Sequence, residues 1–191
     1  MAKAAEGGNG GWTGGWNAGA RRVPSPNCDR RPAGSTVSLI VLHSISLPRG
    51  DYRGDAVERL FTNRLDPAAH PSFAGLAGLR VCAHFLIRRG GSLLQFAPIE
   101  ARAWHAGASR WRGREHCNDF SVGIELEGTD DGEFASAQYE CLATLVQQLQ
   151  QQLPVRDLAA HSDVAPGRKT DPGARFDWTR CLAALCRARV A

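Results

Sequence analysis

The hydrophobic pattern of this chain predicts two long buried strands. Residues 37–42 form a nearly continuous apolar run with β-branched side chains, which is typical of a central strand, and the run ends at His43. Residues 121–127 alternate between apolar and polar side chains, which predicts a strand with two distinct faces. Its apolar face carries Val122, Ile124 and Leu126, and its other face carries Ser121, Gly123, Glu125 and Glu127.

Three further strands follow from local sequence. Residues 80–87 and 92–96 are joined across Arg89-Gly90-Gly91, which is the signal of a β-hairpin. Residues 155–160 predict another strand, and it leads directly into His161. Because α/β proteins tend to place functional side chains at strand ends, the histidines that follow two of these runs are candidates for a site.

Three segments with apolar side chains at three- and four-residue spacing predict helices. Asp55 is expected to cap a short helix over 56–65, Ser136 a long helix that Pro154 ends, and Asp177 a final helix. The side chains expected to face inward are Val57, Leu60, Phe61 and Leu65 in the first helix, Tyr139, Leu142, Ala143, Val146, Leu149 and Leu153 in the second, and Trp178, Leu182, Leu185 and Cys186 in the third.

The start of the chain lacks such patterns. Residues 1–19 are rich in glycine and are expected to form a flexible tail, and two prolines favour an extended arm over 21–26. The folded core is expected to begin near Thr36. A chain of 191 residues fits one core, so residues 20–191 are interpreted as a single domain of the α/β (α+β) class.

Composition excludes several classes of protein. Hydrophobic residues make up 43% and charged residues 22%, which argues against disorder, and no apolar run approaches the roughly 20 residues that span a bilayer. The net charge is +4, but the arginines are dispersed, so nucleic-acid binding has little support. A mildly basic surface equally suits a small acidic substrate.

The cysteine pattern indicates which cellular compartment the protein occupies. Six are present without a CxxC pair or the spacing of a small disulfide scaffold. Residues 1–19 lack the basic and apolar regions of a secretory signal. These features favour the reducing cytoplasm, with the cysteines mostly buried as small hydrophobic residues.

The segment from His161 to Gly173 concentrates groups capable of chemistry. It places an imidazole, the Lys169 amine and the Asp171 carboxylate on one loop rich in glycine and proline. The only other lysine of the chain is Lys3, since every remaining basic side chain among the 23 Lys and Arg is an arginine. Lysine supplies a compact charge with an adjustable pKa, which suggests a specific use for Lys169.

A zinc ion with three protein ligands supplies what amide hydrolysis needs, and His43, His161 and Asp171 are candidates for those ligands. The opposing interpretation is structural, because a lone histidine at a strand end is more often a hydrogen-bonded residue than a ligand. Asp171 before Pro172 is equally consistent with the start of a turn, and Lys169 with a solvated loop charge. Their joint occurrence favours the metal site.

The acid/base group and the oxyanion partner have candidates too. Glu125 and Glu127 lie on the same face of their predicted strand, so periodicity leaves open which carboxylate acts as general base. Lys169 is the candidate for stabilising an oxyanion.

Several ordered blocks resemble the AmpD family of N-acetylmuramoyl-L-alanine amidases, over nearly all of residues 15–178. The blocks are Arg21-Arg-Val-Pro-Ser-Pro, His43-Ser-Ile-Ser-Leu-Pro, Ala103-Trp-His-Ala-Gly, Cys117-Asn-Asp-Phe-Ser-Val-Gly-Ile-Glu-Leu-Glu-Gly and Gly167-Arg-Lys-Thr-Asp-Pro-Gly. The resemblance implies a central mixed sheet flanked by helices, as in phage lysozyme-amidases and peptidoglycan-recognition proteins. The chain departs from the family in its Gly-rich start before Gly15.

The resemblance also implies roles. It assigns one Zn²⁺ per chain to His43, His161 and Asp171, the acid/base role to Glu125, and the oxyanion role to Lys169. Substrate contacts are expected at Arg80 and Trp104, for which a surface charge and a core aromatic are the structural alternatives. His105 is a reserve ligand, and structural roles are expected for His70, His84 and His116.

The implied reaction is hydrolysis of the bond between the lactyl group of a 1,6-anhydro-N-acetylmuramic acid and L-alanine, in cytoplasmic recycling of cell-wall fragments. This reaction would also lower an inducing signal for β-lactamase expression. The substrate is an anhydromuropeptide, and a monomer without nucleic-acid or membrane partners is expected. The alternatives are an exported amidase acting on polymeric peptidoglycan and a muropeptide-binding module without activity.

Overall fold

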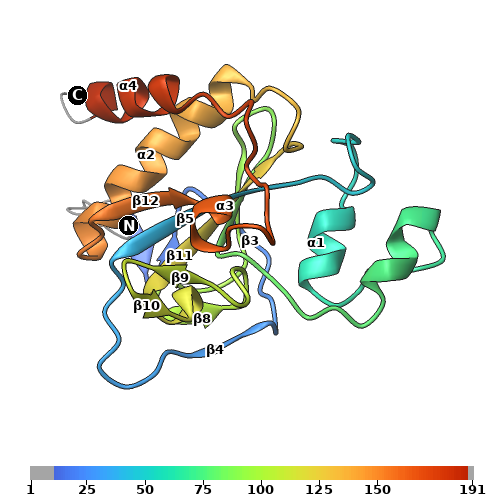
Figure 1. Cartoon of the computed structure of the whole chain (residues 1–191), viewed down its shortest axis with the longest axis horizontal. Helices are drawn as coiled ribbons and strands as arrows, with labels where there is room; N and C mark the ends of the chain where they lie inside the picture. The colour runs from blue at the N-terminus through green and yellow to red at the C-terminus, as the bar shows by residue number, and fades with distance from the viewer. Residues whose placement is uncertain (1–10, 189–191) are drawn as a thin grey trace, which may run out of the picture.

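A six-stranded mixed sheet organises the molecule, in a computed structural model that describes residues 11–188. The strand order is β12-β5-β11-β6-β7-β3 (Figure 1). The strands are β12 (Asp157–Ala160), β5 (Leu39–Ile45), β11 (Ser121–Glu127), β6 (Phe85–Ile87), β7 (Leu93–Gln95) and β3 (Arg21–Arg22). The mixed sheet implied by the family resemblance is confirmed.

The two longest strands lie at the centre of the sheet. β5 and β11 are parallel partners, and β12 and β6 extend the parallel part on either side. β7 then runs antiparallel to β6, and β3 runs parallel to β7. Every residue of β11 is buried, because the sheet is covered on both faces.

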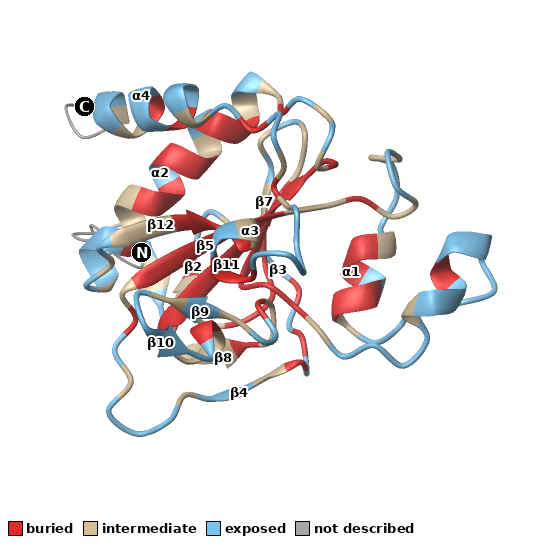
Figure 2. Ribbon diagram, in the orientation of Figure 1, coloured by how far each residue is buried: buried red, intermediate tan, exposed pale blue. Residues whose placement is uncertain are grey.

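One face of the sheet packs on two helices, α2 (Ser136–Gln152) and α4 (Trp178–Ala188) (Figures 1 and 2). The alternation predicted for β11 is confirmed: Val122, Ile124 and Leu126 share a core with buried α2 side chains such as Leu142 and Leu149. The opposite face carries a smaller core around Leu39, Val41, Phe120 and Ala159. The second face leaves room for a site at the carboxyl ends of the central strands.

The predictions for the long helix and for the final helix each need one correction. Ala135, not Ser136, is the N-cap residue of α2, and its backbone N–H donates to the Gln138 side chain at 3.0 Å. Asp177 does cap α4, since its carboxylate accepts from the backbone of Arg180 at 2.8 Å. In α4 the buried residues are Cys181 and Ala184, whereas Leu182 is 56% exposed and Cys186 is exposed. The inward face predicted for these two residues is therefore wrong.

The first predicted helix, expected over 56–65, is shorter than predicted and lies apart from α2 and α4 (Figure 1). α1 covers Ala56–Phe61, after which the backbone turns at Asn63 with φ 59°. Its buried side chains Val57, Leu60 and Phe61 pack on the β6–β7 part of the sheet. A 3₁₀ helix, η1 (Pro71–Leu76), follows.

The predicted hairpin is present, with a shorter first strand. Gly91 has φ +83°, a conformation that favours glycine, and its backbone N–H donates to the Arg88 carbonyl at 2.9 Å. Residues 80–84 are irregular instead of extended β-structure. His84 instead bonds across to β11, with its backbone donating to the Gly123 carbonyl at 3.0 Å.

The start of the chain differs from the predicted tail. Residues 1–10 of that tail lie outside the described part, but residues 11–19 form a hairpin from β1 (Trp12–Thr13) and β2 (Trp16–Asn17). Trp12 packs edge-on against Phe85, and the Asn17 backbone donates to the Gln95 side chain at 2.7 Å. Aromatic burial and these bonds order a segment whose glycine content suggested flexibility.

Smaller elements complete the described chain. They are β4 (Cys28–Arg30) paired with β8 (Ala101–Ala103), β9 (Arg110–Trp111) paired with β10 (Arg114–Glu115), the 3₁₀ helix η2 (Cys117–Phe120) and the short helix α3 (His161–Val164). Across residues 11–188 no helix has the length and apolarity to span a membrane. All six cysteines are unpaired. Burial was predicted for most of them, but only Cys82, Cys117 and Cys181 are buried, whereas Cys28 and Cys141 are half-buried and Cys186 is exposed.

Candidate active site

Two of the predicted site residues are neighbours across the central strands. His43 on β5 lies opposite Glu125 on β11 in the parallel register, so the two side chains leave the sheet on the same face. Both are buried, with 2% and 8% exposure. The sheet itself therefore fixes the distance between a candidate metal ligand and a candidate base.

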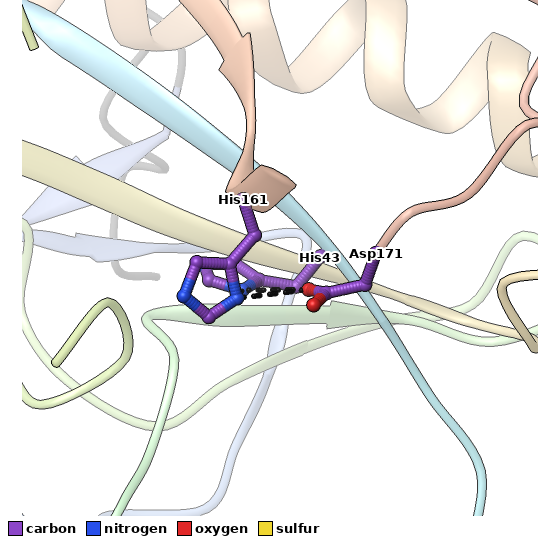
Figure 3. Close-up of side chains that lie close together, drawn as sticks. All are labelled: His43, His161 and Asp171. Atoms are coloured by element: carbon purple, nitrogen blue, oxygen red, sulfur yellow. Dashed lines mark hydrogen bonds and ion pairs between the residues drawn. The ribbon is translucent and has the colours of Figure 1, made fainter. Parts of the chain in front are cut away.

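The third strand of this group delivers His161. β12 pairs with β5 up to Ala160, opposite Leu42, so the next residue arrives beside His43. The Nδ1 atoms of His43 and His161 are 2.9 Å apart. Asp171 completes the group, with its Oδ2 3.0 Å from His161 Nδ1 and 3.2 Å from His43 Nδ1 (Figure 3). The structure thus brings together the three ligands that were predicted from distant segments.

The loop that carries Asp171 is folded back by its own backbone. The Lys169 N–H donates to the Ala165 carbonyl at 3.1 Å, and the Ser162 N–H donates to the Asp171 carbonyl at 3.0 Å. Gly167 turns the chain with φ +74°. At Gly173 a Cβ would lie 1.8 Å from the Asp130 carbonyl oxygen, so only glycine permits this close approach. The glycines of the segment therefore place its carboxylate.

The donor set fits a zinc ion. His161 Nε2 lies 3.2 Å from the Ala106 carbonyl, which can only accept, so this nitrogen carries the proton and Nδ1 keeps its lone pair. Two imidazoles and one carboxylate are the ligands of many catalytic zinc sites. Bonds of about 2.0–2.1 Å would separate tetrahedral ligands by roughly 3.3 Å, close to the separations seen here. These donor atoms form a group able to hold a metal.

The electrostatics of the group favour binding of a cation. Burial lowers the pKa of His43 to about 4, so this imidazole is neutral at physiological pH. Burial acts to raise the pKa of Asp171, but the hydrogen bonds to His161 and His43 outweigh it and the pKa is lowered. A neutral imidazole and an ionised carboxylate are the forms that bind a metal.

Glu125 and Glu127 differ sharply despite sharing a face. Glu127 receives hydrogen bonds from the Arg88 guanidinium and the Arg89 backbone, and it is thereby held in an ion pair. Glu125 Oε2 is buried without a hydrogen-bond partner in the described chain. Burial, reinforced by the Asp171 charge, raises the pKa of Glu125 well above its ordinary value. A buried carboxyl with an unpartnered oxygen, beside side chains that could hold a metal, is the arrangement of a general base or acid.

A cavity of about 540 Å³ joins these groups. It is lined by all the predicted site residues, namely His43, Arg80, Trp104, Glu125, His161, Lys169 and Asp171. Lys169 and Arg80 are exposed at its rim, and Trp104 is half-buried. The apolar side chains Leu76 and Leu79 form part of the wall. The cavity combines a polar part, lined by the candidate site residues, with an apolar wall.

The remaining histidines lie outside the group of three candidate ligands. His105 contacts His43, with its Nδ1 2.9 Å from His43 Nε2, and it is not part of the group of three side chains that could hold a metal. His84 is buried and accepts from the Gly123 backbone at 3.0 Å. His70 accepts from Ser72 at the start of η1, and His116 adopts φ 58° before η2.

One contributor to the site, Arg168, was not singled out by the sequence analysis. Arg168 donates to the carbonyls of Ala106 and Ala108 at 2.6 and 2.7 Å, which ties the loop of Asp171 to the wall of the cavity. Its partners are backbone atoms, and they lie about 60 residues away. Only the tertiary structure could have revealed this role.

Known proteins resemble the chain over most of its length. A family model described as N-acetylmuramoyl-L-alanine amidase matches residues 33–174. The 1,6-anhydro-N-acetylmuramyl-L-alanine amidase AmpD of Escherichia coli K12 is 54% identical over 168 residues, covering 87% of this chain and 92% of that protein.

Solved structures agree with this likeness. A crystal structure of a selenomethionine AmpD derivative has a TM-score of 0.89 at 52% identity, covering 91% of this chain and 98% of the other. Escherichia coli AmiD, in complex with the substrate anhydro-N-acetylmuramic acid-L-Ala-D-γ-Glu-L-Lys, has a TM-score of 0.57 at 26% identity. That match covers 81% of this chain and 60% of AmiD.

Proposed function

The chain belongs to the N-acetylmuramoyl-L-alanine amidase family, and from this premise we propose that it hydrolyses the lactyl–L-alanine amide bond of 1,6-anhydro-N-acetylmuramyl peptides. One observation carries the proposal: three metal-binding side chains, a buried unpaired carboxyl and a lysine converge on one cavity. The relatives named for this activity support the choice of substrate.

His43, His161 and Asp171 would hold one Zn²⁺. Zinc with an open position supplies a Lewis acid for the amide carbonyl and a nucleophile from water at neutral pH. The three residues hold their ligand atoms inward, His161 by donating to the Ala106 carbonyl and Asp171 through its folded loop. The chain's own contribution is a rigid ligand set with access from the cavity.

Glu125 acts as the acid/base group in this proposal. Its carboxylate accepts a proton from the attacking water as the new C–O bond forms, and returns it to the alanine nitrogen as the C–N bond breaks. Burial, reinforced by the Asp171 charge, raises the pKa of Glu125, the direction that favours its return of a proton to the leaving nitrogen. The adjacent strands keep Glu125 beside the ligand His43 throughout.

Lys169 and the rim of the cavity complete the assignment. The Lys169 ammonium stabilises the oxyanion that develops on the carbonyl oxygen. Arg80 contacts a carboxylate of the stem peptide, and Trp104 packs against the sugar; both line the cavity. Arg80, Arg168 and Lys169 give the cavity a basic border that matches an acidic peptide.

The direct test uses purified, zinc-loaded protein and an anhydromuropeptide. Release of anhydro-N-acetylmuramic acid and free peptide is expected, and a chelator should abolish it until zinc is restored. Chromatography with mass spectrometry identifies the products. Intact substrate after incubation with the metal-loaded protein would refute the amidase proposal, and tight binding without cleavage would favour the muropeptide-binding module.

We also propose that the enzyme acts as a monomer in the cytoplasm, where it recycles wall fragments and indirectly lowers β-lactamase induction. The six unpaired cysteines support a reducing compartment. Activity found mainly in a periplasmic fraction would favour the exported amidase acting on polymeric peptidoglycan.

A further inference from the structure

We propose that Ser121 and His105 form a positioning relay that sets which nitrogen of His43 faces the metal, with Gly123 leaving the space that the His105 ring occupies. The inference rests on the zinc site of the proposed function, but it concerns residues outside the ligand group. His105 lies directly behind His43, its Nδ1 2.9 Å from His43 Nε2. Its other nitrogen, Nε2, lies 3.1 Å from the Ser121 hydroxyl. The three side chains His43, His105 and Ser121 are thus joined by consecutive hydrogen bonds.

The direction of this line follows from its far end. The Ser121 hydroxyl donates to the Cys117 carbonyl at 2.6 Å, and a carbonyl has no proton to give. The only proton of the hydroxyl is donated to the Cys117 carbonyl, so the Ser121 oxygen accepts a hydrogen bond from His105 Nε2–H. His105 Nδ1 is then a lone pair and accepts from His43 Nε2–H. Only Nδ1 of His43 remains to bind the cation.

The geometry at the ligand group agrees with this direction. The His43 Nδ1 atom is the one that lies 2.9 Å from His161 Nδ1 and 3.2 Å from Asp171 Oδ2. The opposite tautomer would place a proton on Nδ1, and it would leave Nε2 facing the His105 lone pair. The relay therefore excludes the tautomer that cannot bind the metal.

Gly123 gives an independent reason to infer that the position of the His105 ring is fixed by its surroundings. A Cβ at this position would lie 2.5 Å from His105 Cγ and 2.6 Å from His105 Nδ1. Gly123 lies within the long central strand β11, and glycine weakens a strand interior. The close approach of the imidazole ring accounts for the glycine.

Other contacts hold His105 at this place. Its backbone N–H donates to the Asn118 side chain at 3.2 Å, and the same amide oxygen accepts from Ala106 at 2.8 Å. His84 packs against His105 at 69° with the ring centroids 5.8 Å apart. Partners that orient a metal-binding histidine typically contribute 10- to 100-fold to metal affinity.

The test measures zinc affinity and tautomer, so it does not depend on catalysis. Zinc dissociation constants of the full chain are determined by competition with a chelator. We expect about 10- to 100-fold weaker binding for His105→Phe and weaker binding for Ser121→Ala and Gly123→Ala. In the metal-free wild type, ¹⁵N spectroscopy should show His43 protonated at Nε2, and in Ser121→Ala this preference should be reduced.

Two control variants keep the test specific. Ser109→Ala removes a hydroxyl that also bonds to Cys117 but does not contact His105, so zinc affinity should be unchanged. Gly90→Ala adds a methyl group where nothing lies within 4 Å, and it should also bind zinc normally.

The outcomes separate the relay from the proposed function. Unchanged zinc affinity in His105→Phe and Ser121→Ala, or a His43 tautomer protonated at Nδ1 in the wild type, overturns the relay. A wild-type protein that binds no zinc contradicts the proposed function, while the tautomer measurement still judges the relay. If Gly123→Ala does not fold, His105→Phe and Ser121→Ala decide the matter.

Discussion

Glu125 is the residue at which stability and chemistry conflict most clearly. Its side chain is buried, and one carboxylate oxygen has no hydrogen-bond partner in the described part of the molecule. Leaving a buried polar group without a partner typically costs about 1–3 kcal/mol. A well-paired alternative stands two residues along, where Glu127 bonds to Arg88. The proposed acid/base role of Glu125, beside the candidate ligand His43, accounts for this cost.

The raised pKa of Glu125 predicts a pH-dependent gain in stability on its replacement. As the pH rises above about 4.5, the unfolded chain loses this proton while the folded protein keeps it, so ionisation favours unfolding. Glu125→Gln cannot ionise. In metal-free protein its free energy of unfolding should exceed that of the wild type at pH 7–8 by at least about 1 kcal/mol, and the gap should close below about pH 4.

Urea denaturation at a series of pH values measures this difference. Glu127→Gln is the matched control, because it removes an ion pair with Arg88 and should destabilise the protein at neutral pH. A Glu125→Gln protein that is less stable than the wild type at pH 8 contradicts the prediction.

Lys169 allows a prediction about rate. Replacement by Met removes the charge that the proposal places beside the developing oxyanion, and kcat should fall about 100- to 1,000-fold. Zinc content should stay the same, because Lys169 lies at the cavity and outside the ligand group. Lys169→Arg retains a charge but places it differently, so it should recover only part of the rate. A kcat for Lys169→Met within tenfold of the wild type would exclude the oxyanion role.

At the scale of elements, the local sequence pattern predicted an element correctly where that pattern alone determines the structure. β11 matches its predicted range because strict alternation describes a strand with two chemically different faces. The predicted faces of α4 failed at Leu182, because α2 covers only a narrow stripe of this terminal helix. Residues 80–84 have a composition typical of strands, but they form isolated backbone hydrogen bonds to other segments, such as Cys82 to Trp104 and His84 to Gly123 of β11, instead of a continuous ladder.

The corrected face of α4 can be checked against α2. Leu142 of α2 is fully buried, and Leu182 of α4 is 56% exposed. Leu142→Ala should lower the free energy of unfolding by about 2–5 kcal/mol, whereas Leu182→Ala should change it by less than about 0.5 kcal/mol. Chemical denaturation of both variants gives the comparison. Equal losses would mean that Leu182 is packed.

At the scale of the whole molecule, the site depends on contacts that no local pattern contains. Residue types and strand ends suggested His43, His161 and Asp171, but periodicity could not separate Glu125 from Glu127. What separates them is Arg88, a residue 39 positions from Glu127 that reaches it only in the folded chain. The relay behind His43 is equally tertiary, since His105 and Ser121 meet it from segments 62 and 78 residues away.

The distribution of the cysteines predicts a labelling order for the folded protein. Cys186 is exposed, whereas burial raises the pKa of Cys82 and of Cys181 to about 12. The thiolate is the reactive form, so at pH 8 Cys186 should react first with iodoacetamide. Cys82, Cys117 and Cys181 should react only on unfolding, as followed by mass spectrometry of peptides.

Two cysteine variants test whether the fast-reacting thiol is Cys186. Cys186→Ser should remove the fast phase, and Cys141→Ser, at a half-buried thiol, should leave that phase unchanged. Labelling of Cys82 as fast as Cys186 would show that the packing around β6 opens readily.

The register of β5 and β11 has a mechanical consequence. Neighbouring strands lie about 4.8 Å apart and are held by a ladder of backbone hydrogen bonds, so the spacing of His43 and Glu125 is as stiff as the sheet. The Lys169 side chain is exposed on a loop, where small displacements cost far less. Thermal motion should therefore leave the proposed proton transfer in register while the Lys169 ammonium adjusts to each incoming peptide.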